Sequence, residues 1–96
     1  MIVGFGDAAT KDLFNDERTA RYRRFPADIV KPARRKLMSL NAATSVHDLR
    51  SPPGNKLEEL QGDLAGFWSI RVNEQWRIIF RWSEGRALDV KLTDCH

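Results

Sequence analysis

The sequence predicts an α+β fold in which helices pack on one face of a small, mainly antiparallel β-sheet. Apolar residues recur with the period of a helix as far as about residue 50, and from about residue 56 they alternate with polar residues as in strands. The chain has 96 residues, 42% of them hydrophobic, which is enough for one modest core. We therefore expect a single domain over residues 1–96.

The beginning of the chain is predicted to form a short strand followed by a short helix. Residues 2–5 are mainly apolar and are followed by Gly6-Asp7, which breaks the strand. The Asp7 carboxylate is suited to cap the N-terminus of a helix that continues to Phe14.

The main amphipathic helix is predicted from about Asp28 to Asn41. Its apolar residues fall on one arc of a helical wheel: Ile29, Val30, Ala33, Leu37 and Leu40. Pro32 must lie in the first turn or kink the helix, since an interior proline loses a backbone hydrogen bond. A further helical turn is expected at 46–49, before the Ser-Pro-Pro-Gly breaker at 51–54.

Four strands are predicted in the second half, and the last three form a meander. Their expected ranges are 56–60, 66–72, 76–82 and 86–93. Alternation places one apolar face against the main helix. That face is expected to hold Trp68, Ile70, Val72, Trp76, Ile78, Phe80, Trp82, Leu88, Val90 and Leu92.

The opposite face of the sheet is predicted to carry a row of cations. If three-residue loops join the last three strands, Arg71 and Lys91 lie on either side of Arg77. Like charges directly opposite one another destabilise a sheet, so such a row indicates a bound anion. The alternative is that the side chains extend into water, with Asp89 as a partial counter-ion.

Positive charge is also concentrated in residues 17–36. This segment holds eight basic and two acidic residues, a charge of +6 in a chain of formal charge +3. The imbalance indicates a polyanionic partner, either nucleic acid or an acidic protein segment. The alternative is a solvated helix face.

Several classes of site and location are not supported. Cys95 is the only cysteine, which excludes an internal disulfide, and the two histidines, His47 and His96, have no spaced metal-ligand partners. There is no Gly-rich phosphate loop and no serine in a nucleophile elbow, so we expect neither a metal nor a cofactor. Without a membrane span or signal peptide, the protein is expected to be cytoplasmic and to have no membrane partner.

The remaining polar residues suit metal-independent cleavage of RNA. RNA supplies its own nucleophile, the 2′-hydroxyl, so a nuclease needs a base, an acid for the leaving 5′-oxygen and cations for the phosphorane charge. These groups are available in Lys56, Glu58, Arg77, Asp94 and His96.

Four segments of the chain together resemble the HigB-type toxins of bacterial toxin-antitoxin systems, within the RelE superfamily. The segments are 34–43, which includes Arg-Arg-Lys-Leu, 52–58, 62–78 and the terminal Asp-Cys-His at 94–96. The resemblance implies a RelE-like fold and cleavage of mRNA on the ribosome. It also implies a cognate helix-turn-helix antitoxin of HigA type, with operator DNA contacted only through that antitoxin.

The resemblance also implies roles for individual residues. Arg77 matches the strand arginine that the family places on the scissile phosphate, and Asp94 and His96 match its C-terminal acid-base pair. Glu58 and Gln61 stand where some members have His and Lys, and Cys95 replaces the usual Tyr. We expect Arg77, Asp94, His96 and Glu58 to be catalytic and Lys56, Arg71, Lys91 and Gln61 to bind RNA.

Two functions are compatible with these residues. The first is a ribosome-dependent mRNA endoribonuclease, the toxin of a type II toxin-antitoxin system. The second is a catalytically weakened toxin-fold protein that serves as the binding partner of its antitoxin and as a transcriptional co-repressor, because Gln61 and Cys95 depart from the family pattern. Arg77 and the Asp94-x-His96 end favour the first.

Overall fold

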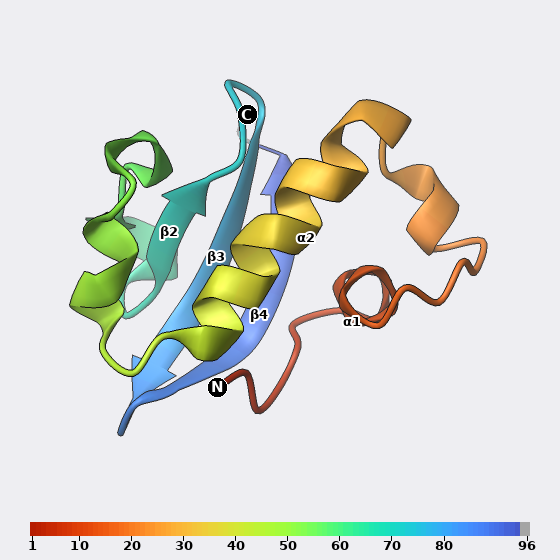
Figure 1. The fold of residues 1–96 in the computed structure, drawn as a ribbon. Coiled ribbons are helices and arrows are strands. Elements are labelled where there is room, and N and C mark those ends of the chain that lie inside the picture. Colours follow the sequence, from red (N-terminus) through yellow and green to blue (C-terminus); the bar gives the residue numbers. More distant parts are fainter. Residues whose placement is uncertain (95–96) are drawn as a thin grey trace.

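The structure, a computed structural model, describes residues 1–94 and has the predicted α+β architecture. A four-stranded antiparallel sheet has the order β1-β2-β3-β4. Helix α2 crosses one face of this sheet, and α1 lies beside α2 (Figure 1). The elements are α1 Ala8–Phe14, η1 Tyr22–Arg24, α2 Ala27–Ala42, η2 Val46–Arg50, η3 Pro53–Asn55, β1 Glu58–Glu59, η4 Gly62–Leu64, β2 Trp68–Arg71, β3 Trp76–Ser83 and β4 Arg86–Asp94.

The N-terminal segment covers the edge of β4. Ile2 and Phe5 form isolated parallel bridges with Ala87 and Val90, so the predicted strand is present as two bridges. Asp7 is the N-cap of α1, as predicted, and its carboxylate accepts a hydrogen bond from the Thr10 N–H at 2.8 Å. Pairing along this edge protects β4 from pairing with other chains.

Helix α2 begins and ends within one residue of the prediction. Pro32 lies inside the helix, beyond its first turn. The apolar arc faces the sheet, where Ile29, Ala33, Leu37 and Leu40 are fully or almost fully buried. These four residues form one core cluster with Leu13 of α1, Leu49 of η2 and the sheet residues Ile70, Ile78, Phe80, Val90 and Leu92. The position of the core thus follows the predicted periodicity.

The β3–β4 register differs from the prediction. Ser83 pairs with Arg86 across a two-residue turn, in which Glu84 and Gly85 both have positive φ (52° and 76°). Two-residue turns of this kind match the twist of a hairpin, whereas we expected three residues. A bulge then follows, where Asp89 also has a positive φ of 51°.

The two irregularities move one predicted core residue and one predicted cation. Ala87 is buried on the helix-facing side, so the assignment of Leu88 to that face is wrong. Beyond the bulge, Lys91 lies opposite Ile79, and Thr93 lies opposite Arg77. The predicted placement of Lys91 directly beside Arg77 is therefore wrong as well, because turn and bulge together shift the register by two residues.

The region before β2 contains less strand than predicted. Only Glu58 and Glu59 pair with β2, whereas the expected strand covered 56–60. Lys56 ends η3 in the left-handed conformation, with φ 45°, so the strand cannot begin there. The expected helical turn at 46–49 is present as η2. Among the described helices, none combines the length and the apolar character needed to cross a bilayer.

Candidate functional site

A cavity of about 290 Å³ brings together four of the predicted site residues. They are Lys56, Glu58, Arg71 and Arg77, and Ser69, Asn73 and Glu74 complete the lining. Arg71 and Arg77 are opposite one another on β2 and β3, as predicted, on the face of the sheet away from α2. The cavity therefore lies where the cation row was expected, with two of its three members.

The two arginines of the cavity are held in different ways. Arg71 Nε donates to the Asn73 carbonyl oxygen at 3.0 Å, which fixes its guanidinium against the β2–β3 turn. Arg77 Nε is buried and has no hydrogen-bond partner within residues 1–94. A buried donor without an acceptor costs free energy, and a bound anion removes that cost. Arg77 is therefore suited to hold a phosphate.

The β2–β3 turn supplies residues that sequence reasoning missed. The Asn73 side-chain oxygen accepts hydrogen bonds from the N–H groups of Gln75 and Trp76, at 2.8 and 2.7 Å. This arrangement places Asn73 and Glu74 on the rim of the cavity. Asparagine at the start of a turn commonly bonds the backbone two residues on, and this signal was available in the sequence.

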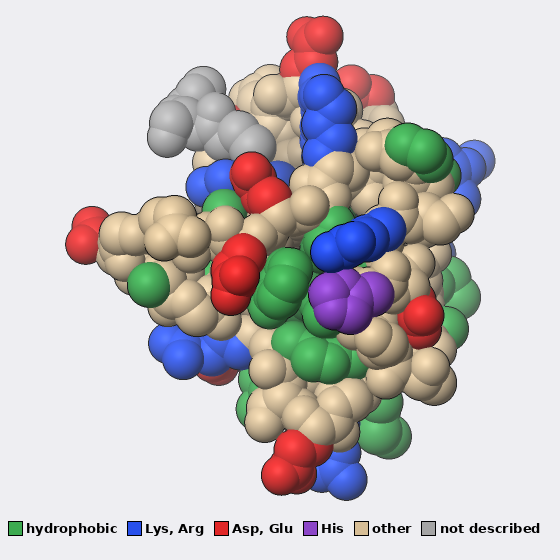
Figure 2. All heavy atoms as spheres, turned by 90° about the vertical axis from the view of Figure 1, so that its left-hand side faces the viewer, with side chains coloured by type: hydrophobic (Ala, Val, Ile, Leu, Met, Phe, Trp, Pro, Cys, Tyr) green, Lys and Arg blue, Asp and Glu red, His purple; other side chains and the backbone are tan. Residues whose placement is uncertain are grey.

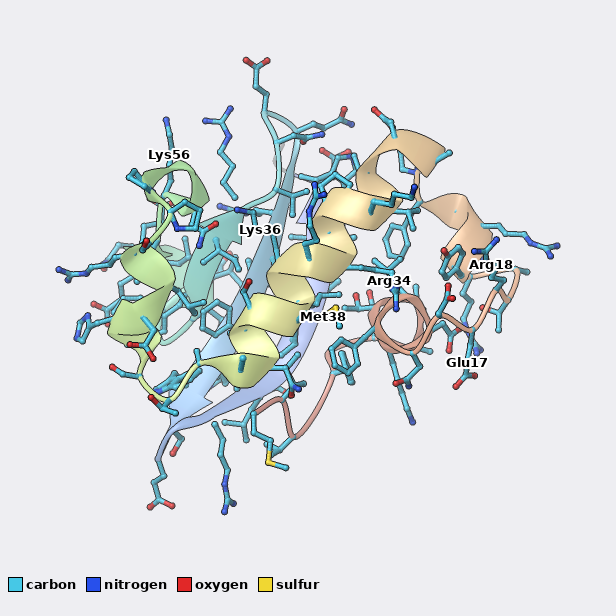
Figure 3. All side chains as sticks on the ribbon, viewed as in Figure 1. Glu17, Arg18, Arg34, Lys36, Met38 and Lys56 are labelled. Carbon is cyan, nitrogen blue, oxygen red and sulfur yellow. The ribbon has the colours of Figure 1, made fainter. Side chains whose placement is uncertain are left out.

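The segment that carries Lys56 and Glu58 is anchored to the helix layer. Asn55 is 1% exposed and donates from Nδ2 to the carbonyl oxygens of Leu49 and Ser51, at 3.1 and 3.4 Å. Lys36 extends from α2 toward η3 and donates to Asn55 Oδ1 (Figure 3). Helix α2 thereby sets the position of one wall of the cavity.

Charges of both signs meet in the cavity. It is lined by three cations and by the carboxylates Glu58 and Glu74, and among the described residues neither carboxylate forms an ion pair with these cations. Figure 2 views the molecule from the side of η2, η3 and β2, where acidic and basic side chains are interspersed. A base and a phosphate-binding cation are thus available within one cavity.

Two predicted RNA-binding residues lie outside the cavity lining. Lys91 is on the same face of the sheet as Arg77 but opposite Ile79. Gln61 is exposed in the segment that precedes η4. The Phe67 ring is covered as well, because the Arg81 guanidinium lies 4.6 Å from its ring centroid.

The C-terminal acid-base pair is only partly described. Asp94 ends β4 opposite Trp76, next to Thr93, which pairs with Arg77. Its Oδ2 accepts a hydrogen bond from Gln75 Nε2 at 3.1 Å, which ties the end of β4 to the β2–β3 turn. His96 and Cys95 lie outside the described residues. In the part of the chain that is described, no group of three His, Cys, Asp or Glu side chains is placed to hold a metal ion.

The basic segment 17–36 is a second concentration of positive charge, and it is tied to α1. Asp12 is 5% exposed and accepts hydrogen bonds from Thr19 Oγ1 at 2.6 Å and Arg21 Nε at 3.0 Å. These bonds, the Thr19 bond foremost, lower the pKa of Asp12. Arg34 Nε donates to the Leu13 carbonyl oxygen at 3.1 Å (Figure 3). Part of this charge therefore holds the fold together.

Comparison with known proteins identifies the family. Residues 3–96 match the family model of the HigB-like toxins, described as RelE-like toxins of type II toxin-antitoxin systems. The chain is 44% identical over 92 residues to Toxin HigB-1 of Vibrio cholerae, covering 96% of this chain and 95% of that protein. It is 33% identical over 96 residues to Endoribonuclease HigB of Proteus vulgaris, covering all of both.

Solved structures show the same fold at low sequence identity. The YoeB toxin in the YoeB-YefM complex from Staphylococcus aureus superposes with a TM-score of 0.61 at 14% identity, covering 100% of this chain and 98% of that one. The YoeB/ParE toxin from Agrobacterium tumefaciens gives a TM-score of 0.54 at 21% identity, with all of both chains covered. With the family match over almost its whole length, the chain belongs to the HigB-like toxins, the RelE-like toxins of type II toxin-antitoxin systems.

Proposed function

We propose that this toxin is an endoribonuclease that cleaves mRNA bound to the ribosome. The relative from Proteus vulgaris is named an endoribonuclease, and it aligns with this chain over its full length. The observation that carries the proposal is the cavity that Arg77 lines together with Arg71 and Glu58. The Nε of Arg77 is buried there and has no hydrogen-bond partner within residues 1–94. Paired guanidinium groups beside a carboxylate suit phosphoryl chemistry.

The reaction proposed is attack of the RNA 2′-hydroxyl on the adjacent phosphorus. The 2′-oxygen forms a bond to phosphorus as its proton passes to a carboxylate, Glu58 or Asp94. The bond from phosphorus to the 5′-oxygen breaks, and His96 donates a proton to that leaving oxygen. Arg77 binds the phosphate oxygens as their charge grows, while Arg71 and Lys56 hold the RNA backbone. The products carry 2′,3′-cyclic phosphate and 5′-hydroxyl ends.

We propose ribosome dependence because the cavity alone does not hold the reacting atoms of the RNA in the orientation that cleavage needs. Cleavage requires the 2′-oxygen, phosphorus and 5′-oxygen to lie in line, and holding reactants in such a geometry lowers the barrier greatly. The cavity of about 290 Å³ is lined by polar side chains and is too small to enclose several nucleotides. The ribosome is expected to hold the mRNA in the reactive conformation.

The proposal includes a HigA-type helix-turn-helix antitoxin that neutralises this toxin, with operator DNA contacted only through it. Membership of a type II toxin family and the likeness to toxins solved with antitoxins support such a partner. A cytoplasmic location follows from action on ribosomes.

The test is cleavage of one mRNA by the purified chain, free and bound to ribosomes. We expect slow cleavage of free mRNA, fast cleavage on ribosomes, and 5′-hydroxyl ends throughout. Cleavage abolished by EDTA while the ribosomes stay intact would contradict the metal-independent mechanism, and so would 5′-phosphate ends.

The role of His96 is tested by deleting it or replacing it with Gln. Loss of a proton-transfer group lowers the rate by roughly 10²- to 10⁴-fold. Folding, checked by circular dichroism, should be unchanged. A His96→Gln chain that cleaves as fast as the parent would exclude His96 as the acid and make Glu58 or Lys56 the next candidate.

The catalytically weakened toxin-fold protein stays as a second candidate because Gln61 and Cys95 depart from the family pattern. Induced expression without antitoxin distinguishes the two functions. Growth arrest that is lost in Arg77→Ala fits the endoribonuclease. Normal growth of cells that accumulate the folded chain would favour the co-repressor.

A further inference from the structure

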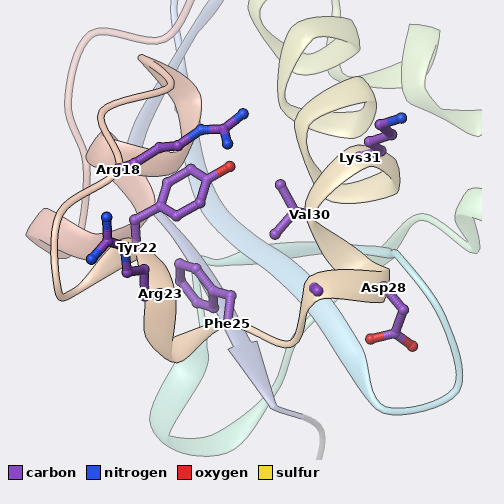
Figure 4. Close-up of a pocket in the computed structure, with 8 residues that line it drawn as sticks. Arg18, Tyr22, Arg23, Phe25, Asp28, Val30 and Lys31 are labelled. Atoms are coloured by element: carbon purple, nitrogen blue, oxygen red, sulfur yellow. The ribbon is translucent and has the colours of Figure 1, made fainter.

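A groove separate from the candidate active site lies between η1 and the first turns of α2 (Figure 4). Its volume is about 590 Å³, larger than that of the site cavity, and the two share no lining residue. It is lined by Arg18, Tyr22, Arg23, Phe25, Ala27, Asp28, Val30 and Lys31. The groove therefore lies within the basic segment 17–36.

The interior of the groove is apolar. Val30 lies at the edge of the apolar arc of α2 and is partly buried against the core, and it faces the Tyr22 ring across the groove (Figure 4). Phe25 is half-buried, and its ring meets the Trp76 ring edge-on, with centroids 5.8 Å apart and planes at 82°. An apolar side chain of a partner would be sheltered from water here.

Cations surround this apolar interior. Arg18, Arg23 and Lys31 contribute three positive charges to the lining, against Asp28 alone. Arg18 has only a 3.6 Å contact with Asp16 and keeps 70% of its side chain exposed. Within the described residues, neither the Arg23 nor the Lys31 side chain has a hydrogen-bond or ion-pair partner. The groove thus has unsatisfied positive charge around an apolar pocket.

The start of α2 adds to the preference for negative charge. Pro26 occupies the N-cap position and makes no side-chain cap hydrogen bond, and the first residues of the helix line the groove. Carboxylates interact favourably with the first turn of a helix.

We infer that this groove binds an acidic peptide segment, with one apolar side chain inserted between Tyr22 and Val30 and flanking carboxylates against the three cations. An amphipathic helix whose apolar residue is followed by Glu or Asp one turn later has this chemistry. The inference rests on the proposed function only for the source of the segment, which is the antitoxin. A segment bound in the groove would not itself occupy the active-site cavity, because the two share no lining residue.

RNA fits the groove less well than a peptide. A nucleobase is bound in a single-stranded site by stacking on an exposed aromatic face. Tyr22 is only 9% exposed, and the Phe25 ring is already engaged by Trp76. The apolar space between Tyr22 and Val30 instead suits an aliphatic side chain.

The inference can be tested with synthetic peptides and the purified full chain, without RNA, ribosomes or antitoxin. The probe is a short helical peptide with Leu flanked by Glu, compared with a Leu→Ser version and a version with Lys in place of Glu. Binding is measured by calorimetry and mapped by the indole N–H signals of the three tryptophans. We expect only the acidic Leu peptide to bind, with weaker binding at high salt, and only the Trp76 signal to shift, because Trp76 contacts Phe25.

Variants of the chain locate the binding. Val30→Asp should weaken binding at least about tenfold, the loss expected for an anchor contact. The double variant Arg23→Glu, Lys31→Glu changes only exposed side chains and should fold normally while having the same effect. The control is Arg86→Glu, an equally exposed cation at the far end of the β3–β4 hairpin, which should bind like the parent.

The outcomes separate this inference from the proposed function. Absence of peptide binding in a chain that cleaves mRNA overturns only the groove. Peptide binding in a chain without cleavage supports the groove and overturns the endoribonuclease. If a short RNA shifts the Trp76 signal and displaces the peptide at equal concentration, the groove is a nucleic-acid site and the inference is wrong.

Discussion

Two regions of this toxin concentrate positive charge, and they use it differently. In the segment 17–36, four of the eight cations have a described partner: Arg18 with Asp16, Arg21 with Asp12, Arg34 with the Leu13 carbonyl and Lys36 with Asn55. On the sheet, Arg71 and Arg77 are neighbours on adjacent strands, and no described carboxylate pairs with them. Half of the cations that are dense along the sequence thus have a partner within the fold, while strand pairing assembles the cations of the candidate site.

Among the variants that test this comparison, the largest loss of cleavage is expected at Arg77. Arg77→Ala should lower cleavage by about 10²- to 10³-fold, because a positioned donor to the phosphorane is lost. The melting temperature should stay the same or rise slightly, since the variant relieves repulsion with Arg71. Rates on ribosome-bound mRNA and thermal unfolding curves give the two readouts.

Arg81 provides a matched control for Arg77. It lies on the same strand and face, but it pairs with Asp89 at 3.4 Å and covers the Phe67 ring. Arg81→Ala should therefore leave cleavage close to that of the parent. A large loss of melting temperature in Arg77→Ala, with Arg81→Ala unaffected, would mean that Arg77 is structural and that the site is misplaced.

A smaller effect should separate Arg71 from Lys91. Arg71 lines the cavity and is fixed by the Asn73 carbonyl, whereas Lys91 lies opposite Ile79 and outside the lining. Arg71→Ala should reduce cleavage by about tenfold, the loss expected for one charge-assisted hydrogen bond. Lys91→Ala should change it by less than about threefold. Equal losses would show that the RNA path extends along β4.

The difference between these two residues shows what the sequence could predict. The β2–β3 pairing was predictable because Val72 and Trp76 are both apolar and enclose a three-residue loop, which places Arg71 opposite Arg77. The β3–β4 pairing was not predictable, because the two-residue turn and the bulge at Asp89 each shift the register by one residue. Together the two shifts restore the alternation of apolar residues near the end of β4, so the pattern there does not reveal them. Only Ala87, small and buried where Leu88 was expected, reveals the shift.

The site was predictable to different degrees in its different parts. Alternation and pairing brought Arg71 and Arg77 together, the acid-base chemistry of RNA cleavage suggested Glu58, and resemblance to the family singled out Asp94 and His96. Asn73 and Glu74 were missed, although they line the cavity. The segment 73–75 was treated only as the loop between two strands, and the side chains of loops often carry functional groups. The anchoring of the Lys56 segment by Lys36 and Asn55 joins residues 19 positions apart and has no local signal.

In the basic segment, the corresponding prediction concerns stability. Asp12→Ala removes the acceptor of Thr19 and Arg21 beneath the segment, so the melting temperature should fall by several degrees. Cleavage per folded molecule should be unchanged, because Asp12 does not line the cavity. Asp16→Ala is the control, since the Asp16 contact with Arg18 is exposed and should matter little. Equal losses in both variants would mean that the buried hydrogen bonds are not the cause.

The smallest expected effect is the pH dependence that the same carboxylate gives. Hydrogen bonds from Thr19 and then from Arg21 lower the pKa of Asp12 in the folded protein below its ordinary value of 3.8. The folded protein therefore binds this proton less readily than the unfolded chain does. The resulting stabilisation is complete above the ordinary pKa, decreases as the pH falls below it, and is absent below the lowered pKa.

Acid unfolding of Asp12→Asn tests this sign against the parent. The variant should be less stable at neutral pH, and the two stabilities should converge as the pH falls below 3.8. Some acid sensitivity must remain in the variant, because the Ser45 and Thr44 backbone N–H groups lower the pKa of Asp48 in the same way. A constant difference between parent and variant at every pH would show that Asp12 acts through packing and neutral hydrogen bonds, and that its charge does not hold the basic segment in place.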